Sequence, residues 1–223
     1  MNSAVSRTWS AVLFDLDGTI IDSGPGILEA LVKTFEHLGL PVPSTEDLMS
    51  FIGPPLKTSF ETYAGFSPEK AAEAVAIYRN DYRGDGGLKA PVFPGILGLL
   101  ESLHDAGIPL GLATSKPEDQ AIKILEAHNL IHFFTVISGA SDEGGRLSKA
   151  DVVAHATSEL SRLGVDTNSV VLVGDRVHDV EGAAEHGIPT IIVEWGYGSP
   201  PEAHGAIATV YSADRLRELL LGN

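Results

Sequence analysis

Short runs of apolar residues recur along the chain, and most are followed by a stretch in which apolar residues return at every third or fourth position. Near-continuous apolar runs are typical of strands that are buried on both faces of a sheet. Such runs predict strands at residues 10–17, 108–115, 133–138, 170–175, 188–195 and 207–212. The helical spacing predicts helices at about 95–106, 118–128, 149–163, 177–186 and 213–221. Strands that alternate with helices pair in parallel, so the pattern predicts an α/β fold with a doubly wound, Rossmann-like parallel sheet.

Residues 22–90 break this alternation. They offer no convincing strand but several stretches with helical spacing, the first of which places four apolar residues between positions 28 and 35 on one face. A segment rich in Gly and Pro at 84–95 then predicts a return to the main domain. The sequence therefore predicts an α/β core domain made of residues 1–21 and 91–223, with an inserted helical cap domain at 22–90.

Composition narrows the classes of function. The chain has 223 residues, of which 43% are hydrophobic and 20% charged, and its net charge of −15 disfavours contact with nucleic acid or anionic membranes. The absence of Cys excludes disulfides and thiolate metal sites. The N-terminus does not resemble a secretory signal, and no window approaches eighteen apolar residues. We expect a cytoplasmic protein, monomeric or homodimeric, that binds neither nucleic acid nor membranes.

Two acidic residues stand where the first predicted strand ends. Asp15 and Asp17 are separated by one residue, and Gly18 and Thr19 follow with a tight turn and a hydroxyl group. Open α/β sheets bind their ligands at the carboxyl ends of their strands. A solvated acidic turn is the alternative interpretation, but a buried strand that runs directly into this sequence favours a functional site.

A second acidic pair follows another apolar run. Asp175 ends the predicted strand and Asp179 lies four residues later, where a negative side chain could also serve only to stabilise a helix N-terminus. Carboxylates gathered at one sheet edge would repel each other by about 4 kcal/mol for a pair 4 Å apart at an effective dielectric constant of ~20. The two pairs together therefore predict a bound cation. Ligation by oxygen atoms alone favours Mg²⁺.

Candidate anion-binding groups follow two further predicted strands. Thr114 and Ser115 precede a predicted helix, and Lys149 begins the next one. Hydroxyl groups, free backbone N–H groups and an ammonium group can bind phosphate oxygens. Each could also be an ordinary helix cap or a surface lysine. In the predicted cap, Gly53 and Lys57 could lie near a substrate or simply form a turn between helices.

These motifs resemble those of one family. The sequence is similar to the haloacid dehalogenase-like hydrolase superfamily, in its phosphoglycolate phosphatase-like branch with an α-helical cap. The matching segments are DLDGT (15–19), LATSK (112–116), the segment around Lys149 and GDRVHD (174–179), in the family's order, with GPPL (53–56) and WGYG (195–198) as additional matches. The resemblance extends over nearly the whole chain.

The resemblance implies a phosphoric monoester hydrolase that depends on Mg²⁺ and acts on a small phosphorylated metabolite, such as phosphoglycolate or a 5′-nucleotide. Asp15 would be the nucleophile that forms an aspartyl-phosphate, and Asp17 would act as general acid and then as general base. Thr114 and Lys149 would hold the phosphate oxygens.

The resemblance also implies a set of metal ligands. Mg²⁺ would bind the Asp15 carboxylate, the backbone carbonyl of Asp17 and the Asp175 carboxylate. Asp179 would either bind the ion as well or hold Lys149 in place.

Other functions are less well supported by the residues. Sugar-phosphate mutases of the superfamily carry a His twelve residues after the nucleophile, where this chain has Ile27. Dehalogenases lack the second acid that Asp17 provides. A non-catalytic, metabolite-binding relative would typically have lost one of the site residues, and a dinucleotide site would need a Gly-rich loop in place of DLDGT.

Overall fold

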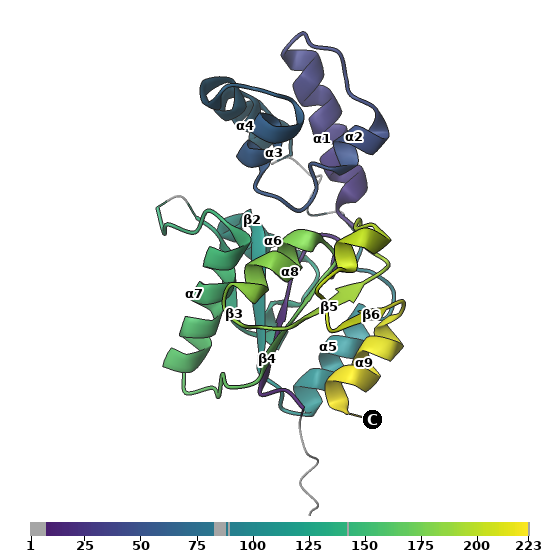
Figure 1. Ribbon diagram of the computed structural model, residues 1–223, viewed down its shortest axis with the longest axis vertical. Helices are drawn as coiled ribbons and strands as arrows, with labels where there is room; N and C mark the ends of the chain where they lie inside the picture. The colour runs from purple at the N-terminus through teal and green to yellow at the C-terminus, as the bar shows by residue number, and fades with distance from the viewer. Residues whose placement is uncertain (1–7, 83–87, 89, 142, 223) are drawn as a thin grey trace, which may run out of the picture.

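The computed structural model describes residues 8–82, 88, 90–141 and 143–222. Within them, six parallel strands form one sheet in the order β3-β2-β1-β4-β5-β6 (Figure 1). The strands are β1 (Ala11–Phe14), β2 (Leu110–Pro117), β3 (Phe134–Ala140), β4 (Val170–Gly174), β5 (Thr190–Val193) and β6 (Ala208–Val210). The predicted α/β fold with a doubly wound parallel sheet is confirmed.

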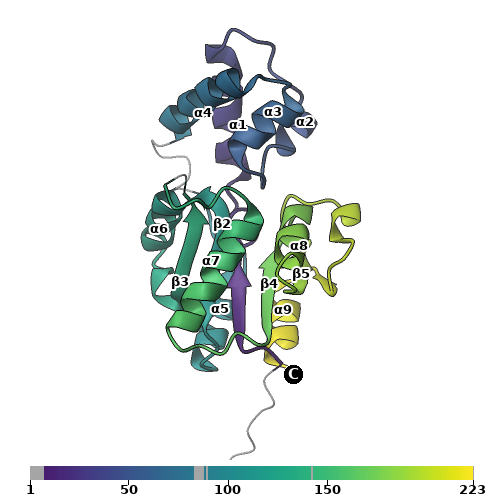
Figure 2. The same cartoon turned by 60° about the vertical axis from the view of Figure 1, so that its left-hand side comes forward.

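Helices cover both faces of the sheet, and the first strand shows why. Val12 and Phe14 point into a core formed with α5 (Ile96–Asp105), α6 (Glu118–Ala127) and α9 (Ala213–Leu221). Ala11 and Leu13 point the other way, into a core formed with α7 (Lys149–Arg162) and α8 (Val177–Ala184). Figure 2 shows α7 and α5 on opposite sides of the sheet. Successive side chains of a strand point to opposite faces, so a strand covered on both sides must be apolar throughout.

Four further helices, which we call the cap helices, lie beyond the carboxyl ends of the strands (Figure 1). They are α1 (Gly24–His37), α2 (Thr45–Met49), α3 (Leu56–Tyr63) and α4 (Pro68–Tyr82). They pack around their own apolar cluster, in which the rings of Phe35, Phe51 and Phe60 lie 5.4–6.2 Å apart. This separate core supports the predicted insertion, whose limits at 22–90 stay a prediction.

The structure adds detail that the pattern did not predict. Helix α2 has only five residues and begins after Ser44, whose hydroxyl accepts a hydrogen bond from the Asp47 N–H. The predicted Gly- and Pro-rich return at 84–95 falls partly outside the described residues, at 84–87 and 89. In the described part of the chain, none of the helices combines the length and the apolar character that a membrane span needs.

Candidate active site

The loop after β1 carries the first acidic pair. The Asp15 N–H donates to the Val173 carbonyl on β4 at 2.9 Å, so the backbone stays beside the sheet until the turn begins. Gly18 has a φ of 81°, and a Cβ atom on it would lie 2.2 Å from a carboxylate oxygen of Asp175. Glycine is therefore needed at this position for two reasons: its backbone conformation, and the close approach of the loop that follows β1 to the loop that follows β4.

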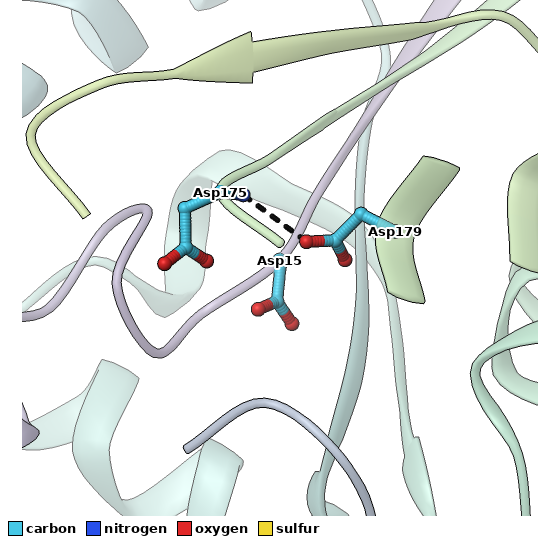
Figure 3. A group of neighbouring side chains, drawn as sticks. All are labelled: Asp15, Asp175 and Asp179. Atoms are coloured by element: carbon cyan, nitrogen blue, oxygen red, sulfur yellow. Dashed lines mark hydrogen bonds between the residues drawn. The ribbon is translucent and has the colours of Figure 1, made fainter. Parts of the chain in front are cut away.

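Three carboxylates meet at the edge of the sheet (Figure 3). Asp15 follows β1, Asp175 follows β4 and Asp179 lies in the first turn of α8, and one oxygen from each lies within 4.8 Å of the others. Asp179 Oδ2 accepts hydrogen bonds from the N–H groups of Asp175 at 3.1 Å and Arg176 at 3.0 Å. The Asp17 side chain lies outside this group, which we call the acidic cluster.

Lys149 supplies a positive charge to the cluster. Its Nζ lies 2.8 Å from Asp15 Oδ1, 2.7 Å from Asp179 Oδ1 and 2.6 Å from the Ala113 carbonyl oxygen. The lysine begins α7, whose N-terminus is fixed by Ser148 and Asp151 in a capping box. The side chain is only 6% exposed, so the ammonium group has these three acceptors in place of water.

One lysine does not neutralise three buried carboxylates. Burial raises the pKa of Asp15 to about 6; Lys149 opposes the rise and the charge of Asp179 adds to it. Burial also raises the pKa of Asp175, to which Asp179 and Asp15 contribute. Asp175 Oδ1 is buried and has no hydrogen-bond partner among the residues that the structure describes. An unpartnered anionic oxygen beside a second carboxylate fits a hard divalent cation.

The phosphate-binding candidates lie at the end of β2. Thr114 is buried, and its Oγ1 accepts a hydrogen bond from the Lys116 N–H at 3.2 Å, whereas Ser115 is partly exposed. Both residues line a cavity of about 460 Å³ between the sheet edge and the cap helices, together with Asp15 and Asp17. Lys149 is not among the residues that line this cavity.

The two predicted cap contacts also line the cavity. Gly53 has a φ of 113° and lies against the Arg176 side chain, where a Cβ atom would be 3.1 Å from Arg176 Cγ. The Lys57 side chain is 57% exposed, and its Nζ lies 3.9 Å from Glu61 Oε1. The turn between α2 and α3, which holds Gly53, and the first turn of α3, which holds Lys57, therefore line the same cavity as Asp15 and Thr114.

Sequence reasoning missed three residues that connect the core to the cap helices. The Arg176 guanidinium donates to the Ile52 carbonyl in the cap and pairs with Glu202 at 2.8 Å. Tyr197 Oη accepts a hydrogen bond from the N–H of Gly24, the first residue of α1, at 2.6 Å and lies 2.8 Å from Asp22 Oδ1. The Tyr197 N–H donates to Asp175 Oδ2 at 2.7 Å. In the sequence, the only feature that pointed to Arg176 and Tyr197 is that they belong to the GDRVHD and WGYG segments.

The third missed residue is Lys116. Its Nζ lies 2.8 Å from Asp17 Oδ2, and it is the last residue of the quoted LATSK segment.

The acidic cluster predicts that Asp175→Asn stabilises the metal-free protein. A neutral amide removes the charge that burial disfavours, and its oxygen can still accept from Tyr197, so we expect a gain of about 1–3 kcal/mol at pH 7. A carboxyl group whose pKa is raised on folding stabilises the protein below its unfolded pKa and loses that contribution as pH rises through its folded value. The advantage of the variant should therefore grow between pH 4 and pH 7.

Urea unfolding in the presence of EDTA measures this effect. Asp119→Asn is the matched control, because the Asp119 side chain is 62% exposed. A variant that is less stable than wild type at pH 7 without metal would contradict the charge imbalance.

Comparisons with known proteins agree with the motifs and the fold. The family model described as "Haloacid dehalogenase-like hydrolase" matches residues 12–193. The chain is 42% identical over 213 residues to the tyrosine-protein kinase PtkA of Mycobacterium tuberculosis, covering 94% of this chain and 72% of PtkA. It is 37% identical over 211 residues to a 5′-nucleotidase of Pseudomonas aeruginosa, covering 94% of both. A phosphoglycolate phosphatase of Cupriavidus necator is 34% identical over 224 residues, covering 98% and 96%.

A solved structure extends the likeness to three dimensions. A predicted phosphatase from Clostridium acetobutylicum superimposes with a TM-score of 0.89 at 37% identity, covering 96% of this chain and 99% of the other. The chain belongs to the haloacid dehalogenase-like hydrolase family. The family and the class of enzyme predicted from the motifs, a phosphatase of that family, are thereby confirmed.

Proposed function

We propose that the protein is a Mg²⁺-dependent phosphatase that hydrolyses a small organic phosphate monoester through an aspartyl-phosphate on Asp15. The observation that carries the proposal is the position of the Asp15 carboxylate. It belongs to the acidic cluster, contacts Lys149 at 2.8 Å and also lines the cavity beside Thr114. One carboxylate thus faces the cation site and the space for a substrate.

The chemistry divides into two transfers at phosphorus. In the first, an Asp15 oxygen bonds to phosphorus, the bond from phosphorus to the ester oxygen breaks, and Asp17 gives its proton to that oxygen. In the second, Asp17 takes a proton from water as the water oxygen attacks phosphorus, and the bond to Asp15 breaks. Phosphate is released and both aspartates return to their starting forms.

The residues around these aspartates support the transfers. The Thr114 hydroxyl and the backbone at the carboxyl end of β2 would bind phosphate oxygens, since Thr114 and Ser115 line the cavity at the sheet edge. Lys149 orients the nucleophile, because its ammonium group donates a hydrogen bond to Asp15 Oδ1 while Lys149 itself does not line the cavity. Its positive charge also lowers the repulsion between an anionic nucleophile and an anionic substrate.

The metal ligands we propose are the carboxylates of Asp15 and Asp175 and the backbone carbonyl of Asp17. Asp179 fits the supporting role better, because Oδ1 is taken by Lys149 and Oδ2 by two backbone N–H groups. A bound Mg²⁺ would supply positive charge where the phosphate and the nucleophile meet.

The cavity favours a 5′-nucleotide over phosphoglycolate as the class of substrate. Its volume of about 460 Å³ lies in the range of sites for drug-sized ligands, which are larger than phosphoglycolate. Phe51, Tyr78 and Tyr82 contribute aromatic rings to the lining on the cap side. Aromatic side chains of this kind can stack on a base.

A panel of phosphorylated metabolites tests the proposal. With Mg²⁺, we expect phosphate release from 5′-nucleotides with a higher kcat/KM than from phosphoglycolate. EDTA should abolish release and Mg²⁺ should restore it, whereas Ca²⁺ should not, because its larger and more flexible coordination does not suit the same geometry. Phosphate release that is unaffected by EDTA would contradict the metal assignment.

Three further assays separate the alternatives. Isomerisation of sugar phosphates without phosphate release would indicate a mutase, which Ile27 argues against. Because PtkA is named a tyrosine-protein kinase, ATP with a tyrosine-containing peptide belongs in the panel. Metabolite binding without turnover of any compound would indicate a non-catalytic relative.

A further inference from the structure

Lys116 is a buried lysine at the edge of the candidate active site that the steps above do not use. It lies near the end of β2, and its side chain is 5% exposed. Its Nζ lies 3.0 Å from Oδ1 and 2.8 Å from Oδ2 of Asp17. Because burying an unpaired ammonium group is costly, this two-oxygen contact is a strong constraint on the Asp17 carboxyl group.

The same ammonium group also contacts the cap helices. Lys116 Nζ lies 3.4 Å from Tyr82 Oη and 5.0 Å from the centre of the Tyr82 ring, and Tyr82 is the last residue of α4. An ammonium group has three donors, and the two Asp17 oxygens and the tyrosine hydroxyl account for all of them. The two buried lysines of the site therefore serve different carboxylates, Lys149 the nucleophile and Lys116 the second aspartate.

We infer that Lys116 is the positioning residue for Asp17, holding its carboxyl group toward the cavity for proton transfer. The inference rests on the proposed function, in which Asp17 exchanges a proton with the ester oxygen and then with water. Asp15, Asp17, Lys116 and Tyr82 all line the same cavity. Tyr82 connects this arrangement to the cap helices, so the orientation of Asp17 depends on a residue of the cap.

A positioning role for Lys116 makes the effect of its loss depend on the leaving group of the substrate. An alkyl phosphate releases a strongly basic alkoxide that needs a proton, whereas 4-nitrophenyl phosphate releases a phenolate that is stable without one. A residue that positions the general acid therefore matters for the alkyl ester and little for the aryl ester. A lysine that binds the phosphate itself would affect both esters alike, since both carry the same phosphate group.

The experiment measures aspartyl-phosphate formation in single turnovers with enzyme in excess. For Lys116→Met we expect formation from an alkyl phosphate to be about 10²- to 10³-fold slower, and from 4-nitrophenyl phosphate less than ~10-fold slower. KM for the alkyl ester should stay within about threefold of wild type, because the loss lies in the chemical step. Lys116→Arg should recover part of the lost rate.

A double variant tests whether Lys116 acts through Asp17. In the Asp17→Asn background, adding Lys116→Met should cause no further loss, because the group it positions is already gone. Tyr82→Phe removes one partner of Lys116 but keeps the ring, and should show the same preference for the aryl ester with a smaller loss. This variant keeps the test informative if Lys116→Met does not fold. Lys123→Met, an exposed lysine on α6, is the control with unchanged rates.

Equal slowing of both esters, a raised KM at unchanged kcat, or a full additional loss in the double variant would each overturn the inference while leaving the phosphatase in place. If wild type forms no aspartyl-phosphate from either ester, the proposed function fails, and the role of Lys116 fails with it.

Discussion

Asp15→Asn is expected to reduce phosphate release by about 10⁴- to 10⁶-fold, because an amide cannot form the covalent bond to phosphorus that the carboxylate forms. The side chain should keep its place, since an amide oxygen can still accept from Lys149 at the position where Asp15 Oδ1 now lies. Steady-state assays with Mg²⁺ and a good substrate from the panel measure the loss.

The control for this variant is Asp119→Asn, an exposed aspartate on α6. It should retain the wild-type rate. Thermal unfolding should show that Asp15→Asn remains folded, so that its loss is chemical. Turnover within tenfold of wild type in a folded Asp15→Asn protein would exclude Asp15 as the nucleophile.

Lys149→Met is expected to impair both stability and catalysis. It removes the cation that Asp15 and Asp179 share, and breaking a buried ion pair from one side costs about 3–5 kcal/mol. We expect a rate about 10²- to 10³-fold lower at saturating Mg²⁺, the size of effect seen when one charge-stabilising group is lost. Urea unfolding in EDTA and steady-state kinetics with Mg²⁺ measure the two effects separately.

A double variant distinguishes charge balance from catalysis. Adding Asp179→Asn to Lys149→Met removes one of the unpaired carboxylates, so stability should return toward wild type while activity stays low. Lys123→Met should change neither property, because the Lys123 side chain is 64% exposed. A Lys149→Met protein that is as stable as wild type would contradict the assigned role of Lys149 in the acidic cluster.

The fold could be predicted from sequence because its main signals are local. A strand covered by helices on both faces must be apolar throughout, and residues 170–174 show this without reference to the rest of the chain. The short helix α2 could not be predicted, because five residues give too little periodicity. The first strand was predicted to reach residue 17 but ends at Phe14, since the chain turns at Gly18 to bring the aspartates together.

The candidate site, like the fold, could be predicted from the sequence only in part. Asp15, Asp17, Asp175 and Asp179 were identified because each stands at a recognisable place, the end of an apolar strand or the start of a helix. The pair between Lys116 and Asp17 joins residues 99 positions apart. The bond between Tyr197 and Asp22 spans 175 positions. Contacts of this kind depend on how the cap helices meet the sheet, which one sequence does not specify.

The most direct test of the central claim is to trap the phosphorylated residue. Asp17→Asn lacks the base for the second transfer, so with Mg²⁺ and 4-nitrophenyl phosphate it should accumulate the aspartyl-phosphate. Borohydride reduces an acyl phosphate of aspartate to homoserine, and peptide mass spectrometry then locates the residue. We predict homoserine at position 15 and none in the Asp15→Asn/Asp17→Asn double variant. Reduction at Asp175 or Asp179, or no reduction at any residue while 4-nitrophenol is being released, would contradict the claim.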